Sequence, residues 1–218
     1  MESEYETQVY PATDEIGVAL AVRLLREGQV VAFPTDTVYG VGCDLWQPEA
    51  IERLYWVKQR PHQLAIPVLV ATPQDVAQVA SHLPASFAPL AERFWPGGLT
   101  LIVPRRPEVP DILCMGGPTV AVRMPDHPLA LRLIAALGGA LAVTSANLSG
   151  HPAPTTATEV LADLQGRVPL ILDGGRCAEG VASTIISLVA DPPVLLRRGA
   201  ISVETLRQAV PSLVESLP

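Results

Sequence analysis

The sequence has no long apolar run and no basic leader. No uninterrupted apolar stretch approaches the ~20 residues that a transmembrane helix needs. The first ten residues, MESEYETQVY, contain three glutamates and neither lysine nor arginine, whereas a signal peptide begins with basic residues and continues with an apolar segment. We therefore expect a cytoplasmic protein that is not associated with a membrane.

Cysteine and positive charge are also scarce. Cys43, Cys114 and Cys177 are odd in number and far apart, so they favour neither a disulfide framework nor a CxxC metal or redox site. We predict three reduced thiols packed in the interior. A formal net charge of −7 argues against a broad nucleic-acid-binding surface but leaves room for a local basic cavity.

Several familiar catalytic signatures are missing. The segment GRCAEGVA from Gly175 has two glycines of a phosphate-binding loop but lacks its lysine and serine or threonine. The segment GVGCDL from Gly40 lacks the third glycine of a dinucleotide-binding turn, and Ser145 lacks the flanking glycines of a hydrolase nucleophile. The four histidines do not have the spacing of zinc ligands. The sequence therefore favours none of these four enzyme classes.

Short apolar segments alternate with amphipathic ones along the chain. Helices are predicted at about 14–27, 48–58, 73–81, 86–94, 127–137, 156–164 and 203–210. Strands are predicted at 29–33, 66–71, 99–103, 119–124, 140–144, 169–172, 183–190 and 193–197. Fully apolar strands separated by helices indicate an α/β fold with a mixed sheet covered on both faces. The segment 108–118 is predicted to be a boundary or mobile loop between two lobes.

Four polar segments directly follow predicted strands. They are PTDTVYG from Pro34, RMPDHP from Arg123, TSANLSG from Thr144 and RRGA from Arg197. These residue types also build turns and helix caps, so one segment alone favours neither role. Because ligands of open α/β sheets bind beyond the carboxyl ends of the strands, four such segments together predict a ligand site at one edge of the sheet.

The segment YWVKQRP adds two cations. Pro61 disfavours a helical conformation for Arg60, so the helix is predicted to end near Lys58. In an extended chain Lys58 and Arg60 project to the same side, and an ammonium beside a guanidinium suits a polyphosphate. The alternative is that Lys58 stabilises the carboxyl end of the helix while Arg60 is a solvated charge.

Five motifs in this order resemble the YrdC/TsaC family of threonylcarbamoyl-AMP synthases: FPTDTVYG, KQRP, VAVRMPDHP, TSANLSG and LLRRGA. The resemblance extends from about Gln29 to Val210. It implies an open, twisted mixed sheet with flanking helices around a deep, positively charged cavity. It also implies the short form of the family, with one YrdC-like domain over residues 1–218 whose segment 1–12 is flexible or peripheral.

The same resemblance implies the reaction. L-threonine, bicarbonate and ATP, with Mg²⁺ accompanying the ATP, would give threonylcarbamoyl-AMP and pyrophosphate. The product would pass to a threonylcarbamoyl-transferase machinery that forms N6-threonylcarbamoyladenosine at position 37 of tRNA, which makes tRNA an indirect partner. Such a condensation requires no protein nucleophile, so catalysis would consist of positioning and stabilisation of charge on the phosphates.

Site residues are also implied by the resemblance. The threonine-binding residues would be Thr37, Arg123, Val143 through its backbone, and Ser183. The ATP-binding residues would be Lys58, Arg60, Thr119, Ser145, Asn147, Ala153 through its backbone, and Arg197. Within this set Lys58, Arg60, Ser145 and Asn147 would be catalytic, and no side chain is assigned as a metal ligand. Leu64 and Leu69 stand where many relatives have asparagine and histidine.

Two other functions fit the same sequence. One is a paralogue of this fold that binds a nucleotide or handles carbamoyl-adenylate in another pathway, such as carbamoyl transfer in hydrogenase maturation. The other is an RNA-binding module. Thr37 and Arg123 together favour the synthase over the paralogue, and the net negative charge argues against the RNA-binding module.

Overall fold

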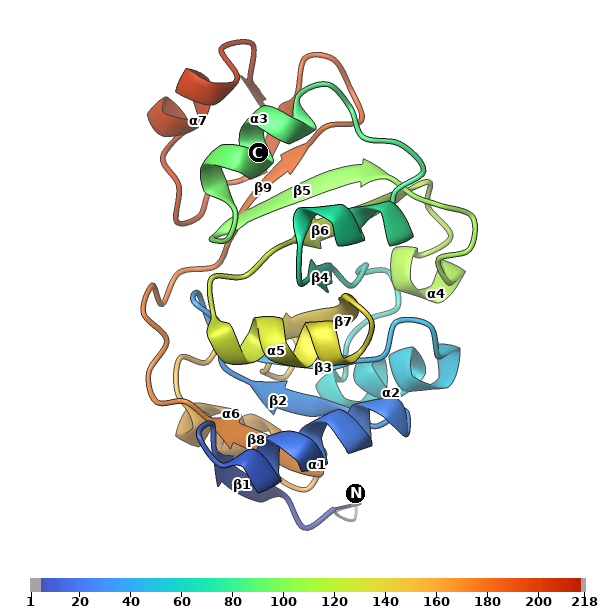
Figure 1. Cartoon of the computed structure of the whole chain (residues 1–218), viewed down its shortest axis with the longest axis vertical. Helices are drawn as coiled ribbons and strands as arrows, with labels where there is room; N and C mark the ends of the chain where they lie inside the picture. Colours follow the sequence, from blue (N-terminus) through green and yellow to red (C-terminus); the bar gives the residue numbers. More distant parts are fainter. Residues whose placement is uncertain (1–4, 217–218) are drawn as a thin grey trace.

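Nearly all the strands and helices expected from the sequence are present in the computed structural model, which describes residues 5–216 (Figure 1). The strands are β1 (Gln8–Pro11), β2 (Val31–Phe33), β3 (Gly40–Cys43), β4 (Val68–Val70), β5 (Leu99–Pro104), β6 (Thr119–Arg123), β7 (Ala140–Ser145), β8 (Leu170–Asp173), β9 (Thr184–Ser187), β10 (Val194–Arg197) and β11 (Val214–Glu215). The helices are α1 (Glu15–Arg26), α2 (Pro48–Lys58), the 3-10 helix η1 (Pro73–Gln78), α3 (Phe87–Phe94), α4 (Asp111–Cys114), α5 (Pro128–Ala136), α6 (Ala157–Leu164) and α7 (Val203–Ala209). The predicted α/β fold with an open mixed sheet is confirmed.

All eleven strands of the described chain lie in one sheet, in the order β1-β8-β2-β3-β7-β4-β6-β5-β9-β10-β11. The edge strand β1 belongs to the N-terminal segment that we expected to be flexible or peripheral, of which residues 1–4 lie outside the described residues. β2 and β7 are both antiparallel to β3, so they run in the same direction. β6 runs the opposite way, because it is parallel to β4, which is antiparallel to β7.

The reason for expecting the four polar segments together, strands that share one direction, is wrong, although the segments after β2 and β6 do meet, because Arg123 donates to Thr37 Oγ1 at 2.7 Å. β10 is antiparallel to β9, β9 is parallel to β5, and β5 is antiparallel to β6, so β10 runs with β6. β6 and β10 thus run in the opposite direction to β2 and β7. The rule applies to strands that share a direction, and this sheet mixes directions.

Both faces of the sheet are buried by helices. Val31 and Phe33 of β2 pack in a cluster with residues of α1 and α5, whereas Ala32 packs in the other cluster with Leu54 of α2 and Val160 of α6. Successive side chains of a strand point to opposite faces. Because each face meets helices, the central strands β2 and β4 are apolar at every position, which is the pattern that predicted them.

Two helices have ends that the sequence located well. Asp14 caps α1, since its carboxylate accepts a hydrogen bond of 2.8 Å from the backbone N–H of Ile16. α2 begins at Pro48 and ends at Lys58 because Gln59 adopts a left-handed conformation with φ of 48°. The predicted end of this helix is confirmed, and it places Lys58 in the last helical turn.

The segment 108–118 is not a boundary or mobile loop. It contains α4, and Leu113 and Cys114 are buried in the main core cluster. The backbone N–H of Ile66 donates to the carbonyl of Leu113 at 2.9 Å, which ties this segment to the chain before β4. The three cysteines are free and buried, as predicted. No helix among residues 5–216 combines the length and apolar character needed to cross a bilayer.

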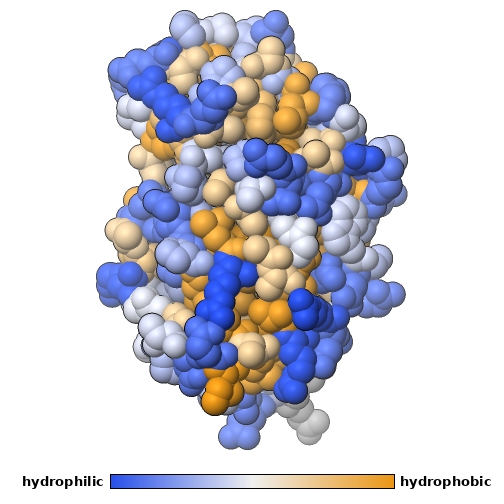
Figure 2. Space-filling model, in the orientation of Figure 1, coloured by the Kyte–Doolittle hydropathy of each residue, from blue (hydrophilic) through white to orange (hydrophobic). Residues whose placement is uncertain are grey.

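The visible surface carries an apolar patch over α1 and α5, in the lower half of Figure 2. Side chains of both helices line a shallow groove there, including Val18, Val22 and Ala136. An ion pair between Arg132 and Glu15 lies at this groove. Within the part of the chain that the structure describes, no residue assigned to the predicted site lines it.

Candidate active site

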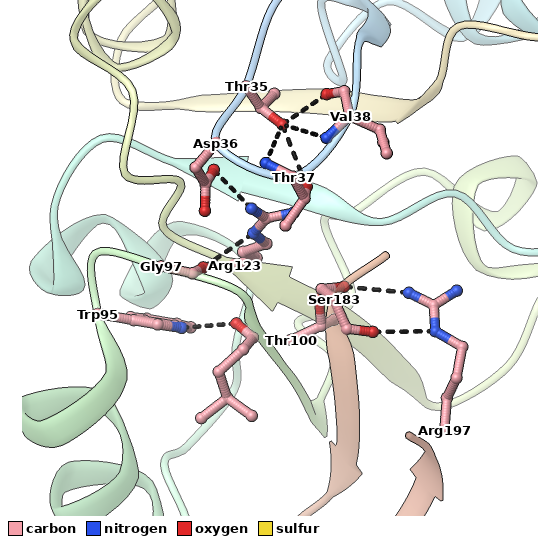
Figure 3. Close-up of polar contacts among 11 residues, drawn as sticks. Thr35, Asp36, Thr37, Val38, Trp95, Gly97, Thr100, Arg123, Ser183 and Arg197 are labelled. Carbon is pink, nitrogen blue, oxygen red and sulfur yellow. Dashed lines mark hydrogen bonds and ion pairs between the residues drawn. The ribbon is translucent and has the colours of Figure 1, made fainter. Parts of the chain in front are cut away.

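The loop between β2 and β3 contains three buried polar residues, Thr35, Asp36 and Thr37. The hydroxyl of Thr35 donates to the carbonyl of Val38 at 2.6 Å and accepts from the backbone N–H groups of Thr37 and Val38, both at 3.3 Å. These bonds close a tight turn of the kind that threonine favours. The turn directs the side chains of Asp36 and Thr37 toward Arg123 (Figure 3).

Arg123, the last residue of β6, is 7% exposed and organises this region. Its guanidinium donates from Nε to the carbonyl of Gly97 at 2.9 Å, from Nη1 to Thr37 Oγ1 at 2.7 Å, and from Nη2 to Asp36 Oδ1 at 2.6 Å. A guanidinium has five N–H groups, and these bonds use three of them. The other two N–H groups of this buried cation have no hydrogen-bond partner among residues 5–216.

Ser183 and Arg197 lie beside this group. The hydroxyl of Ser183 is 2.8 Å from that of Thr100 in β5, and Arg197 donates to the carbonyl and hydroxyl of Ser183 at 3.0 and 3.1 Å (Figure 3). Burial and the charge of Arg123 both lower the pKa of Arg197. The two arginines thus lie in one electrostatic environment, to which an anionic ligand would be attracted.

The segment after β8 covers the loop that carries Asp36. The backbone N–H groups of Glu179 and Gly180 donate to the carbonyls of Asp36 and Thr37, both at 3.0 Å. Burial raises the pKa of Glu179, and the negative charge of Asp36 raises it further, while Arg123 lowers it. A second carboxylate therefore lies close to the Asp36–Arg123 pair.

A second group of predicted residues surrounds Lys58, which is 1% exposed. Its ammonium donates to the carbonyl of Ser145, to the carbonyl of Asn147 at 2.6 Å, and to the side-chain oxygen of Asn147 at 3.3 Å. An ammonium has three N–H groups, so all of them are used by the loop after β7. Burial lowers the pKa of Lys58 to about 7, and the charge of Arg60 lowers it as well.

Arg60 makes fewer contacts with the protein. Its Nε and Nη2 donate to the carbonyls of Leu64 and Ala65 at 3.0 and 2.8 Å, so three of its five N–H groups have no partner within the described part of the chain. Leu64, which stands in place of the asparagine common in relatives, supplies this contact through its backbone while its side chain is exposed. Leu69 is buried in β4.

The structure brings the predicted residues into two groups. One contains Thr37, Arg123, Ser183 and Arg197, and the other contains Lys58, Ser145 and Asn147, with Arg60 close enough for its charge to lower the pKa of Lys58. The loop of Thr37 connects them, because it continues into β3, where Gly40 pairs with Ser145 and Tyr39 accepts a hydrogen bond from the backbone of Ala146 at 2.8 Å.

Three predicted residues lie outside these two groups. Thr119 is paired with Pro104 at the opposite end of β6 from Arg123, and Ala153 is exposed. Val143 lies in β7, where its backbone N–H donates to the carbonyl of Pro67 at 2.9 Å.

Sequence reasoning missed Asp36, Gly97 and Thr100, which contact the predicted residues directly. Asp36 could have been found because it lies inside the PTDT motif. Gly97 acts through its carbonyl, and Thr100 lies in a buried strand, so neither had a signal in the sequence. Among residues 5–216, no three His, Cys, Asp or Glu side chains are close enough together to hold a metal ion.

Comparison with known proteins shows which family and which relatives this chain is similar to. Residues 23–199 match the Sua5/YciO/YrdC family model, described as "Telomere recombination". A Bacillus subtilis protein named threonylcarbamoyl-AMP synthase is 44% identical over 200 residues, an alignment that covers 91% of this chain and 58% of that protein. A putative threonylcarbamoyl-AMP synthase of Mycobacterium tuberculosis is 36% identical over 194 residues, and the alignment covers 89% of this chain and 89% of that protein.

A solved structure gives a comparison of the fold. The crystal structure of P. abyssi Sua5 complexed with L-threonine matches with a TM-score of 0.90 and 38% sequence identity, covering 96% of this chain and 61% of that one. The chain thus spans less than two thirds of the Bacillus subtilis and P. abyssi proteins.

Proposed function

Because the chain belongs to the Sua5/YciO/YrdC family, we propose that it is a threonylcarbamoyl-AMP synthase. The reaction would condense L-threonine, bicarbonate and ATP into threonylcarbamoyl-AMP and pyrophosphate. The observation that carries the proposal is the buried guanidinium of Arg123, which holds Thr37 and keeps two N–H groups free. A relative solved with L-threonine supports the choice of amino acid.

The amino acid would bind at the group around Arg123. A carboxylate accepts two parallel hydrogen bonds from a guanidinium, and such charge-assisted pairs are among the strongest polar contacts in proteins. Arg123 keeps one N–H group on each of Nη1 and Nη2, the two nitrogens from which such a pair can be donated. The hydroxyl of Thr37, which contacts Arg123, and that of Ser183, which contacts Arg197, would then select the threonine side chain (Figure 3).

The triphosphate would be held by arginine. Arg60 and Arg197 each use two N–H groups on the protein and keep three, whereas Lys58 uses all three of its own. We therefore assign the phosphate contacts to Arg60 and Arg197. We assign to Lys58 the role of fixing the loop of Ser145 and Asn147 against the nucleotide. The Mg²⁺ ion would arrive as part of the Mg–ATP substrate.

The chemistry then needs only positioning and charge. The amine of threonine and bicarbonate form a carbamate with loss of water, and a carbamate oxygen attacks the α-phosphorus while pyrophosphate leaves. Cations aimed at the phosphate oxygens stabilise the charge that develops in such a transfer. We further propose that the product passes to a transferase machinery that modifies tRNA, and that the enzyme works in the cytoplasm.

Pyrophosphate release tests this assignment. With ATP, Mg²⁺, L-threonine and bicarbonate present, the protein should release pyrophosphate steadily. Omitting either threonine or bicarbonate should reduce release to the background, because the attacking carbamate cannot form. Equal release without threonine and without bicarbonate would instead identify a nucleotide hydrolase. Release that requires bicarbonate but does not depend on threonine would indicate another carbamoyl-adenylate chemistry.

A further inference from the structure

One oxygen of the Asp36 carboxylate is buried without a partner. Asp36 is 7% exposed, its Oδ1 accepts a hydrogen bond of 2.6 Å from Arg123, and its Oδ2 has no hydrogen bond within the described residues. A buried polar atom without a partner is costly and uncommon. The free oxygen therefore marks a place where a donor from outside the protein is expected.

The position of this oxygen indicates which donor. Figure 3 shows the Asp36 carboxylate beside the guanidinium of Arg123, with its second oxygen turned away from their hydrogen bond. The pair thus offers a free anionic acceptor next to two free cationic N–H groups. An α-amino acid carries a carboxylate and an ammonium on the same carbon. Its carboxylate can therefore pair with Arg123 and its ammonium with Asp36.

We propose that Asp36 Oδ2 receives the α-ammonium group of the amino-acid substrate on binding, before that group loses a proton to solvent and reacts as the amine, while Arg123 holds its carboxylate. This inference rests on the proposed function and adds a residue that determines specificity. An acid of the same shape without the amine would leave Oδ2 buried and unpaired, and sites built to pair a substrate N–H reject such analogues strongly. The residues Asp126 and Glu179 also carry negative charge here, but both are exposed to water, whereas Asp36 Oδ2 is buried without a partner.

The experiment compares two ligands on three proteins by titration calorimetry. L-Threonine and 3-hydroxybutanoate share a carboxylate and a hydroxyl, and only threonine has the amine. The wild type should bind threonine at least about 30-fold more tightly. Asp36→Asn keeps an oxygen for Arg123 but loses the charge, so threonine should bind about 10- to 100-fold more weakly with little change for 3-hydroxybutanoate. Asp126→Asn, a matched loss of a nearby exposed carboxylate, should behave as the wild type.

The outcomes separate this inference from the proposed function. A wild type that neither binds threonine nor releases pyrophosphate overturns both. If the wild type makes the product but binds threonine and 3-hydroxybutanoate equally, only the role of Asp36 is overturned. This comparison uses the wild type, so it does not depend on whether a variant folds. If Asp36→Asn weakens both ligands by the same factor, Asp36 merely supports Arg123, and the inference is again wrong.

Discussion

Replacing Arg123 with methionine should weaken the binding of L-threonine at least about 100-fold, because the two charge-assisted hydrogen bonds lost are worth about 1.5 to 3 kcal/mol each. The same change should lower the free energy of unfolding by about 3 to 5 kcal/mol, since it leaves the Asp36 carboxylate buried without its cation. Calorimetric titration with threonine and urea denaturation measure the two effects. ATP binding should change far less, because the assigned phosphate contacts come from Arg60 and Arg197.

Arg105 provides a matched control for this variant. It also donates to a carboxylate and a carbonyl, those of Asp111 and Val109, and its side chain is 12% exposed. Arg105→Met should leave threonine affinity unchanged and cost less stability, because Asp111 remains solvated. Adding Asp36→Asn to Arg123→Met should restore part of the stability without restoring binding. Wild-type threonine affinity in Arg123→Met would show that the pocket lies elsewhere.

Replacing Lys58 with methionine should reduce the synthesis of threonylcarbamoyl-AMP at least about 100-fold, by analogy with the loss of other groups that position a reacting complex. Methionine has a similar length but no donor, so the carbonyls of Ser145 and Asn147 lose their partner and the loop that carries both residues loosens. Arg26→Met is the control, because that exposed cation also donates to a carbonyl, that of Ala136. Full activity in Lys58→Met would contradict the assigned role.

Lys58 is the single lysine of the chain, so its titration can be observed directly. In protein labelled with ¹⁵N-lysine, the one side-chain resonance should titrate with a pKa of about 7 in place of the ordinary 10.5. Between these two values the unfolded state binds more protons than the folded state, so the free energy of unfolding contributed by this group rises with pH. That contribution is lost as the pH falls through about 7, and it should be absent in Lys58→Met.

How much of the fold the sequence predicts depends on the element. The ends of α2 were predicted because Pro48 and the proline after Arg60 act locally. β3 was missed because it contains two glycines, which are rare in strands. A Cβ on Gly40 would lie 2.8 Å from Val143 Cγ1, and one on Gly42 would lie 2.8 Å from the carbonyl oxygen of Ala142. The close approach of β7 therefore requires glycine there, and only the tertiary structure reveals it.

The site shows the same division between local and tertiary information. The resemblance supplied Thr37 and Arg123, and the structure brings them into contact at 2.7 Å. The direction of β6 relative to β2 could not be read from either segment, because strand polarity depends on pairings between distant residues. The sequence likewise could not show that the protein itself accepts the hydrogen bonds of the Lys58 ammonium. The carbonyl oxygens that it contacts belong to Ser145 and Asn147, which lie 87 and 89 residues further along the chain.

The most direct test of the central claim is the identity of the product. Purified protein would be incubated with Mg–ATP, L-threonine and ¹³C-bicarbonate, and the reaction would be examined by mass spectrometry. We predict a threonylcarbamoyl-AMP ion that carries one ¹³C, that retains the label on the carbamoyl fragment, and that disappears when threonine is omitted. A reaction that yields pyrophosphate or AMP with no labelled adduct, or a labelled adduct that forms without threonine, would contradict the assignment of this chain as a threonylcarbamoyl-AMP synthase.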